Sequence, residues 1–544
     1  MPSARDFDLL IVGSGPSGVH AAQEAVASGC KVGLLDIGHT DERFDKLIPA
    51  KPFSEIRRTD SAQSVYFLGD DPEAAFRSQA RAGAHLTPAR QHMIRDMDEL
   101  FPLKSETFLP LQSSGLGGLG IGWGANCFAL EDFELEQIGL PAAEMRDLYA
   151  AAVREIGVSG PADDILSPLI ANLDRSALQP ALRLDSNAQN LLECYRRRKA
   201  SFLDGGFYLG QSLLAMLSRP LDTREANSYR DMDFWGDVGR SVYRPRYTLE
   251  KLRGAPNFVH LGGRLALRFE ELGDGVRLSV RNLATNSPES LTARKLILSA
   301  GAINSGKLAL ASLGDYDSRL PILCNANHWI AAINLRMLGK PARDARHSLS
   351  QLTALLKVEQ RDRGYISAQF YSYRSLLLSR MLKSIPFPPS LGLLFLRLTA
   401  TAFTCVNVHF PDWRSNRRWM SLNQDGSIQA ECAWEAEETS WINRQERRLL
   451  KHLLALRCIP LGIARPEHGA SIHYAGTLPY SEARRPLTTD AAGRLNGFQS
   501  VFVADASTWR FLPAKGLTLT LMANARRIAR QAVRDLHNEG SANG

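Results

Sequence analysis

The chain has 544 residues, of which 44% are hydrophobic and 22% are charged, and its formal net charge is +8. This length exceeds what one hydrophobic core serves, so we expect a globular protein of about two to four domains. The positive charge is modest and spread over many residues, which argues against a nucleic-acid partner.

The seven cysteines are scattered singly and include no C-x-x-C pair. This pattern favours reduced thiols over a disulfide framework or a zinc site. No secretory signal precedes the first apolar run, and prolines and Arg397 interrupt the longest apolar region, residues 385–408. We therefore expect a cytoplasmic protein that spans no membrane and binds no metal ion.

The first informative stretch is an apolar run at residues 9–12, followed by glycines at the spacing G-x-G-x-x-G. Gly13 permits a tight turn from a buried strand into a helix, Gly15 lets backbone amides approach a pyrophosphate, and Gly18 lets the helix pack close to the strand. The helix is expected over residues 19–28. Its positive end would hold the pyrophosphate.

A second strand is expected over residues 31–35 and leads to Asp36. An acid at this place accepts hydrogen bonds from the ribose hydroxyls of an adenosine cofactor and repels a 2′-phosphate. Strand, glycines, helix, strand and acid together predict a dinucleotide-binding unit. The pattern does not distinguish NAD from FAD.

Residues 115–126 form a second glycine-rich stretch, with embedded Leu, Ile and Trp. So many glycines make a poor helix or strand, and the apolar side chains argue against a solvated linker. We therefore expect its backbone to approach a flat or phosphorylated ligand. Residues 136–245 are expected to be helices joined by loops, and the basic cluster at 196–199 is interpreted as a solvated helix face.

Strand periodicity begins near residue 258. The change includes residues 258–261, and a small antiparallel meander is expected over residues 265–271, 276–282 and 291–294. A buried strand over 295–299 then ends at Ala300 and Gly301, before a helix that includes residues 307–312. A strand that ends at a glycine before a helix is suited to a cofactor at the carboxyl edge of a sheet.

The rest of the chain is less regular. Strands are expected over residues 351–358 and 365–373, and a basic amphipathic helix over 374–382. Such a helix could touch a membrane surface or an acidic lipid-linked substrate. The favoured interpretation is a helix that faces the core and has a solvated basic rim.

The chain closes with a short strand over residues 501–504, Asp505 at its carboxyl end, and a helix from Thr518 to about residue 537. We expect this strand to join the sheet of the amino-terminal strands, which makes the cofactor domain discontinuous. A helix amino terminus at Thr518 would stabilise negative charge that develops at the N1 and O2 atoms of a flavin.

These motifs resemble the glucose-methanol-choline oxidoreductases, a family of FAD-dependent enzymes. The resemblance covers residues 7–38, 115–128, 257–310, 471–477 and 490–530. It implies an α/β (α+β) fold, with a Rossmann-like FAD-binding domain and a substrate domain built on an antiparallel sheet with helices. The expected FAD-binding parts are residues 1–135, 246–312 and 479–544. The expected substrate-domain parts are residues 136–245 and 313–478.

The resemblance also implies the cofactor contacts. Some members carry a flavin-linking histidine at the place of Gly122, so we expect FAD to bind non-covalently. The residues implied are Gly13, Ser14, Gly15 and Gly18 at the pyrophosphate, Asp36 at the ribose, Leu265 and Ala266 near adenine, Gly122, Gly124 and Ala125 beside the isoalloxazine ring, Ala300 and Gly301 at the sheet edge, Asp505 and Ala506 at the pyrophosphate and ribityl chain, and Thr518.

His473, in the motif His-x-x-Gly-Thr, resembles the family's active-site histidine, and an imidazole suits a base near neutral pH. The family usually places a second histidine or an asparagine shortly before the last helix, and here that place is Gly516. The substrate's hydrogen-bond partner is then missing, or is supplied by Lys515 or by the substrate domain.

We therefore expect an FAD-dependent alcohol or sugar oxidase or dehydrogenase. It would oxidise a CH–OH group of a sugar or lipid-linked alcohol by hydride transfer to flavin N5, with His473 as base. The missing partner at Gly516 leaves two alternatives: a lyase or isomerase that retains the flavin, and a non-catalytic flavoprotein binding subunit, peripheral at a membrane. The electron acceptor, the substrate and the oligomeric state are left open.

Overall fold

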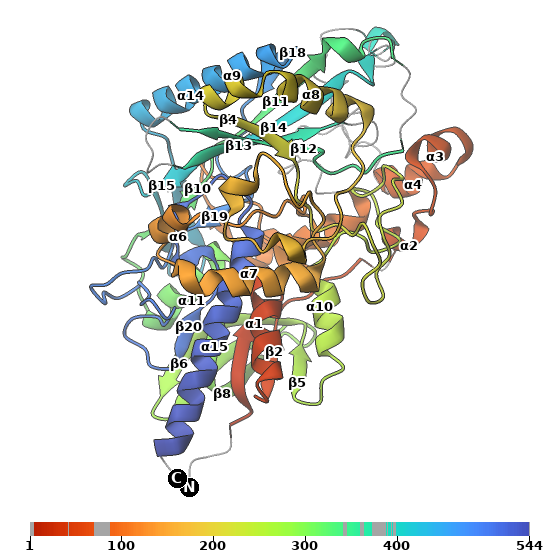
Figure 1. Ribbon diagram of the computed structural model, residues 1–544. Coiled ribbons are helices and arrows are strands. Elements are labelled where there is room, and N and C mark those ends of the chain that lie inside the picture. Colours follow the sequence, from red (N-terminus) through yellow and green to blue (C-terminus); the bar gives the residue numbers. More distant parts are fainter. Residues whose placement is uncertain are drawn as a thin grey trace.

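The structure is a computed structural model, and it describes residues 5–41, 43–69, 87–340, 345–358, 364–372, 388, 390–392, 394 and 399–542. Figure 1 shows one sheet in the lower half of the molecule, near both chain termini, and a second sheet in the upper half. Helices and long loops lie between the two sheets. The helix expected over residues 374–382 falls outside the described residues.

The lower sheet has the order β5-β2-β1-β8-β7-β6, and β20 also pairs with β8. Its parallel strands are β1 (Phe7–Val12), β2 (Val32–Leu35), β5 (Phe258–Leu261), β8 (Pro288–Leu298) and β20 (Val501–Val503). The antiparallel strands β6 (Arg264–Leu272) and β7 (Gly275–Asn282) extend it. The carboxy-terminal strand thus joins the amino-terminal sheet, as the sequence predicts.

The sequence predicts separate strands over residues 291–294 and 295–299, but in the structure one continuous strand, β8, covers both as far as Leu298. Its first half pairs antiparallel with β7, and its second half pairs parallel with β1 and β20. The meander and the cofactor-binding edge are therefore parts of one sheet.

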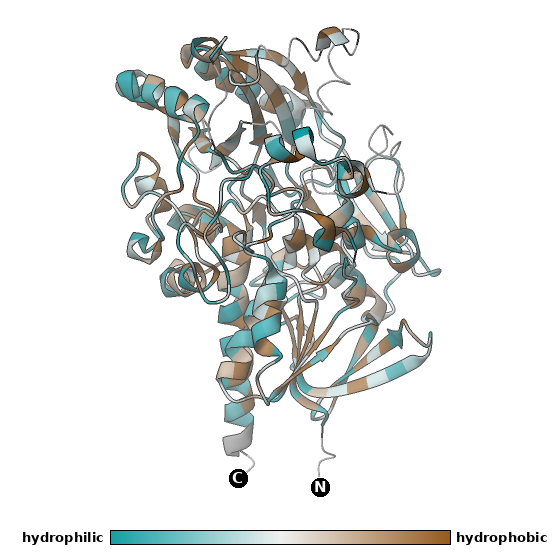
Figure 2. Cartoon of the chain, turned by 90° about the vertical axis from the view of Figure 1, so that its right-hand side faces the viewer, coloured by the Kyte–Doolittle hydropathy of each residue, from teal (hydrophilic) through white to brown (hydrophobic). Residues whose placement is uncertain are grey.

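Helices cover this sheet. α1 (Pro16–Ala27) packs against α15 (Thr518–Ala542), and α15 also contacts α7 (Ala142–Ile156). In Figure 2 the helix that ends at the C label carries both hydrophobic and hydrophilic residues, as expected for a helix with one buried side. α10 (Pro245–Leu252) and α11 (Ala302–Leu313) complete this part.

The upper sheet is antiparallel and has the order β18-β11-β14-β13-β12-β4. Its strands are β4 (Phe207–Gln211), β11 (Asn327–Asn334), β12 (Leu352–Lys357), β13 (Tyr365–Tyr371), β14 (Phe403–His409) and β18 (Cys458–Ala464). β12 and β13 fall where strands are expected. β4 is a strand inside the region expected to be helical, because its pairing with β12 is non-local.

The two faces of the upper sheet differ in polarity. One face is apolar and packs in a core with α8 (Ser186–Arg197) and α14 (Ala436–Ala455), through residues such as Ile330, Ala368 and Val406. Figure 1 shows these helices above the sheet. Because strand side chains alternate, the intervening residues face the lower half of the molecule. That second face carries polar side chains.

The smaller elements connect these layers. One small sheet contains β3 (Leu103–Lys104), β9 (Leu320–Pro321), β16 (Arg418–Leu422) and β17 (Ile428–Cys432), and two further pairs are β10 (Leu323–Cys324) with β19 (Tyr474–Ala475) and β15 (Asp412–Trp413) with β21 (Phe511–Leu512). Short α-helices are α2 (Phe44–Leu47), α3 (Phe53–Thr59), α4 (Gln63–Leu68), α5 (Met97–Leu100), α6 (Asp132–Ile138) and α9 (Lys199–Asp204). The 3₁₀ turns are Pro88–Ile94, Gly118–Ile121, Ser167–Ile170, Arg175–Ala177, Leu335–Met337 and Ala506–Thr508.

All seven cysteines are free thiols and are buried. Among the described helices, none is long and apolar enough to cross a membrane.

Candidate active site

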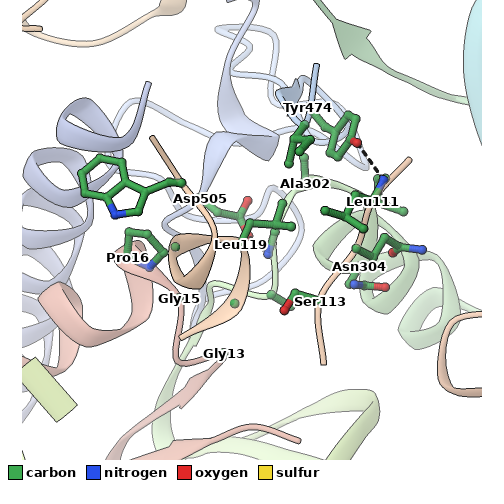
Figure 3. Close-up of a pocket in the computed structure, with 18 of the residues that line it drawn as sticks. Gly13, Gly15, Pro16, Leu111, Ser113, Leu119, Ala302, Asn304, Tyr474 and Asp505 are labelled. Atoms are coloured by element: carbon green, nitrogen blue, oxygen red, sulfur yellow. Dashed lines mark hydrogen bonds between the residues drawn. The ribbon is translucent and has the colours of Figure 1, made fainter. Parts of the chain in front are cut away.

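A cavity of about 370 Å³ is lined by residues of both sheets and of the loops between them. Figure 3 shows part of its lining, from Gly13 and Gly15 at the β1–α1 turn to Tyr474 and Asp505 near the other end of the chain. Every residue that the sequence analysis assigns to cofactor or substrate lines the cavity, except Gly18, Ala125 and Lys515, which are not among its described lining residues.

The β1–α1 turn is shaped for an anion. Gly15 is the N-cap of α1, and no side chain of the described residues caps this helix end. A Cβ atom on Gly15 would lie 4.0 Å from the carbonyl oxygen of Gly117, the nearest neighbour, so the turn is open on this side. The first backbone amides of α1 thus lie beside a cavity that a phosphate group can enter.

Gly13 and Gly18 have a different role from Gly15. Gly13 has φ +107°, and a Cβ on Gly18 would lie 1.7 Å from the carbonyl oxygen of Gly13. Gly18 therefore allows α1 to pack against the turn, as its position in the motif predicts. It is not among the described residues that line the cavity.

Ser14 links the predicted ribose-binding residue to the glycine-rich loop. Its hydroxyl donates to the Asp36 carboxylate and accepts from the backbone N–H of Gly117 at 2.9 Å. The other Asp36 oxygen accepts from Nε2 of His260 at 2.9 Å. Asp36 lines the cavity, so its carboxylate is held in place to accept a ribose hydroxyl.

Asp505 is buried, and its carboxylate is bound by the chain itself. It accepts from the backbone N–H of Gly301 at 2.9 Å, from Oγ of Ser305 at 2.6 Å and from the N–H of Ser507 at 2.9 Å. Burial raises its pKa against the effect of these hydrogen bonds. Asp505 joins the ends of β8 and β20, so a cofactor contact at residue 505 would come from its backbone.

Two further features favour a polar ligand in this cavity. The side-chain oxygen of Asn304 is buried and has no hydrogen-bond partner among the described residues, and Figure 3 shows Asn304 in the cavity wall. The helix α15 begins at Thr518, which lines the cavity together with Gly516. The open amides of α1, the Asp36 carboxylate and this second helix terminus fit the pyrophosphate, ribose and flavin of FAD.

His473 lines the same cavity. The antiparallel pair β10–β19 joins Cys324 to Tyr474, so the next residues, Asn325 and His473, lie opposite each other. Nδ1 of His473 is 3.0 Å from Oδ1 of Asn325. Ile472 before it has φ +62°, which a β-branched residue rarely adopts and which is common at functional sites.

The hydrogen bonds of Asn325 determine which nitrogen of His473 carries a proton. Nδ2 of Asn325 donates to the carbonyl oxygens of Phe410 at 2.7 Å and Leu512 at 3.4 Å. Because a carbonyl only accepts, Oδ1 of Asn325 is its acceptor side, and Nδ1 of His473 donates to it. Nε2 of neutral His473 then carries the lone pair that can accept a proton.

The polar face of the upper sheet forms another wall of the cavity. Asn327, Gln369, Tyr371, Asn407 and His409 line it, beside Trp329. Cross-strand register places Asn327 opposite His409, and Trp329 opposite Asn407, which is itself opposite Gln369. None of these residues is among those predicted from the sequence motifs. Their signal is the alternation of polar with apolar residues in buried strands, as in Asn407-x-His409.

Lys515 does not reach the cavity, in contrast to the expectation that it can supply the substrate's partner. Its ammonium is fully buried and donates to the Glu134 carboxylate at 2.6 Å and to the carbonyl oxygen of Leu169 at 2.9 Å. Gly516 does line the cavity, but a Cβ there would lie 2.6 Å from the carbonyl oxygen of Asn126. This geometry does not support a catalytic role for Lys515 and leaves no room for a side chain at residue 516.

Replacing Lys515 by methionine should lower the free energy of unfolding by about 3–5 kcal/mol, because the buried Glu134 carboxylate loses its partner. Urea unfolding of the purified variant measures this change. The double variant Lys515→Met, Glu134→Leu should recover most of the loss, since it buries no unpaired charge. A single variant as stable as the wild type would contradict a structural role for Lys515.

A parallel sheet, an open helix terminus and a cavity lined by residues of two sheets are features typical of α/β proteins that bind a dinucleotide cofactor. No family model matches the sequence, and no curated protein sequence matches it either. The fold matches the crystal structure of pyridoxine 4-oxidase from Mesorbium loti, with a TM-score of 0.55 and 15% identity over 97% of this chain and 99% of that one.

Pyridoxine 4-oxidase is a member of the glucose-methanol-choline oxidoreductase family. The chain therefore has the fold of these oxidoreductases, and the resemblance drawn from its motifs is confirmed at the level of the fold.

Proposed function

We propose that this chain is an FAD-dependent oxidoreductase that oxidises the CH–OH group of a small polar alcohol to an aldehyde or ketone. The observation that carries the proposal is the geometry of His473, which lines the cavity and whose Nδ1 donates to Oδ1 of Asn325 at 3.0 Å. This arrangement leaves Nε2 as the proton acceptor that an alcohol oxidation requires.

The cofactor assignment is supported by the donor set of the cavity. The α1 terminus and Gly15 would hold the pyrophosphate, and Asp36 the ribose. The start of α15 at Thr518 would lie toward the flavin. When bound, FAD supplies an acceptor for the hydride that leaves the alcohol carbon. We further propose that FAD binds non-covalently, because Gly122 occupies the place of the flavin-linking histidine that some family members carry.

His473 performs the proton transfer in the proposed reaction. Asn325 holds the imidazole by accepting its Nδ1–H at Oδ1, and it receives no proton itself because an amide oxygen is not basic near neutral pH. The hydroxyl proton of the substrate moves to Nε2 of His473. The two electrons of the C–H bond leave with the hydride, so the substrate loses one proton and one hydride.

The wall opposite the cofactor-binding turn favours a small polar substrate over a lipid-linked one. It presents the amides of Asn327, Gln369 and Asn407 and the ring of Trp329. Asn327, Gln369 and Asn407 already hydrogen-bond within the protein, but an amide has more donor and acceptor sites than these bonds use. A hydrocarbon chain would exclude water from the remaining sites without replacing its hydrogen bonds, which is costly, whereas hydroxyl groups can replace them. A compound with several hydroxyl groups fits this wall best.

The test is the visible absorbance spectrum of the purified protein under anaerobic conditions, with pyridoxine, D-glucose, benzyl alcohol and cholesterol added in turn. We expect a bound flavin spectrum that is bleached by a polar alcohol and not by cholesterol. Bleaching by cholesterol alone would contradict the substrate class. A flavin that none of these compounds bleaches would favour the non-redox enzyme or the binding subunit.

A further inference from the structure

A second histidine lies in the cavity beside His473. His409, at the end of β14, is 4% exposed and lines the same cavity. The rings of His409 and His473 stack, with centroids 4.7 Å apart and planes inclined by 25°. The two residues come from different parts of the chain, so only the folded structure brings them together.

A chain of hydrogen bonds determines the protonated nitrogen of His409. Nδ2 of Asn327 donates to the carbonyl oxygen of Val408 at 3.2 Å, which identifies it as the amide nitrogen. The same nitrogen donates to Oδ1 of Asn407. Nδ2 of Asn407 is therefore the atom that lies 3.2 Å from Nε2 of His409, and Nε2 accepts its hydrogen.

Because Nε2 of His409 is an acceptor, the proton of the neutral ring is on Nδ1. Nδ1 is buried, and no described residue pairs with it. A buried N–H donor without a partner is unfavourable unless a ligand or water satisfies it. Since His409 lines the cavity, a ligand oxygen in the cavity is a suitable acceptor.

His409 keeps its neutral form in this setting. Burial, first, and the nearby His473, second, lower its pKa well below the ordinary value for histidine. A neutral His409 donates a hydrogen bond at neutral pH but does not compete with His473 for the substrate's proton. The two stacked rings therefore offer opposite functions, an acceptor on His473 and a donor on His409.

We propose that His409 is a catalytic residue that donates its Nδ1–H to the oxygen of the substrate while His473 removes the proton from that oxygen. This inference rests on the proposed function. His409 keeps its own proton throughout, and its hydrogen bond strengthens as negative charge develops on the oxygen. It thereby supplies the donor that Gly516 lacks, from a strand of the upper sheet and not from the segment before α15.

Asn407 and Asn327 are positioning residues in this scheme. Through the carbonyl of Val408 they hold the proton of His409 on Nδ1 and the ring in one orientation. An aspartate at residue 407 would accept from Nε2 and so move the proton of neutral His409 to that nitrogen. Asn407→Asp should then remove the donor from the cavity while His409 itself is kept.

The first test measures the proton positions directly. The flavin-loaded protein is prepared with isotope-labelled histidine, and the ring nitrogens of His409 are assigned by the loss of their NMR signals in His409→Gln. We expect the proton on Nδ1 in the wild type and on Nε2 in Asn407→Asp. A wild-type His409 that carries its proton on Nε2 would overturn the inference, whatever the substrate.

The second test measures the rate of flavin reduction by the alcohol of the panel above that bleaches the wild type. His409→Ala should lower this rate about 100-fold, as expected for loss of one donor to a developing charge. His409→Gln retains an N–H donor and should recover part of the rate. His452→Gln, which changes a histidine outside the described lining of the cavity, is the matched control and should match the wild type.

The outcomes separate the two proposals. A wild type that no alcohol reduces contradicts the proposed function, and the proton positions still decide the donor assignment of His409. If an alcohol reduces the flavin of the wild type and of His409→Ala at the same rate, the proposed function is retained and the role of His409 is overturned. Equal loss in His409→Ala and His409→Gln, with the flavin content unchanged, would also contradict donation from residue 409.

Discussion

The variant His473→Ala should reduce its flavin about 100- to 10,000-fold more slowly than the wild type, because it lacks the base for the hydroxyl proton. The prediction rests on the orientation of the imidazole, since Asn325 accepts the N–H at Nδ1 and Nε2 is then the nitrogen with the basic lone pair. The rate is measured by anaerobic stopped-flow absorbance with the alcohol that reduces the wild type. The flavin content should be unchanged, because the α1 terminus and Asp36 are intact.

Asn325→Ala is the matched variant for this prediction. It keeps the imidazole but removes the acceptor of its Nδ1–H, so we expect a smaller loss and a change in the pH dependence of the reduction rate. A variant that only damaged packing would lower stability without changing the pH profile. Reduction at the wild-type rate in His473→Ala would contradict the assignment of His473 as the base.

The variant Gly18→Ala should fail to retain FAD and should lose about 3 kcal/mol or more of stability. A Cβ at this position would lie 1.7 Å from the carbonyl oxygen of Gly13, so α1 must move away from the turn that it closes. The movement would displace the α1 amides from the place where the pyrophosphate binds. The ratio of flavin to protein absorbance and the thermal unfolding midpoint measure the two effects.

Gly273→Ala is the control for this substitution. Gly273 lies between β6 and β7 of the same sheet, and no described atom lies within 4 Å of a Cβ placed there. The control should retain FAD and lose at most about 1 kcal/mol. A Gly18→Ala variant that retains FAD and unfolds like the control would show that α1 packs less tightly against the turn than the structure indicates.

Some of this protein is determined by local sequence. The apolar run of β1, the glycines and Asp36 lie close together along the chain, and their roles depend on backbone geometry that neighbouring residues impose. The structure bears out the turn, the helix and the strand that follow from this pattern. The close packing of Gly18 against the carbonyl of Gly13 is an example of a contact that the sequence predicts, because both residues belong to one motif.

Other features depend on contacts between distant residues. β4 pairs with β12 across the domain, and its own sequence does not distinguish it from the helices around it. Lys515 is next to Gly516 in the chain, yet its partner is Glu134, to which it donates at 2.6 Å. Proximity in sequence suggested a role at the cavity, and burial in the folded chain gives the ammonium a different place.

The residues of the candidate site likewise fall into two groups, those that a local motif identifies and those that only strand pairing brings together. The motif of His473 identifies it from sequence, because its neighbours Gly476 and Thr477 lie beside it. Asn325 follows β10 directly, and His409 is the last residue of β14. Their positions follow from the pairing of β10 with β19 and of β11 with β14. Local sequence thus determined the glycine-rich turn and pointed to His473 as the proposed base. Only tertiary structure decided which polar groups surround that base, because strand pairing brings together residues that no local pattern connects.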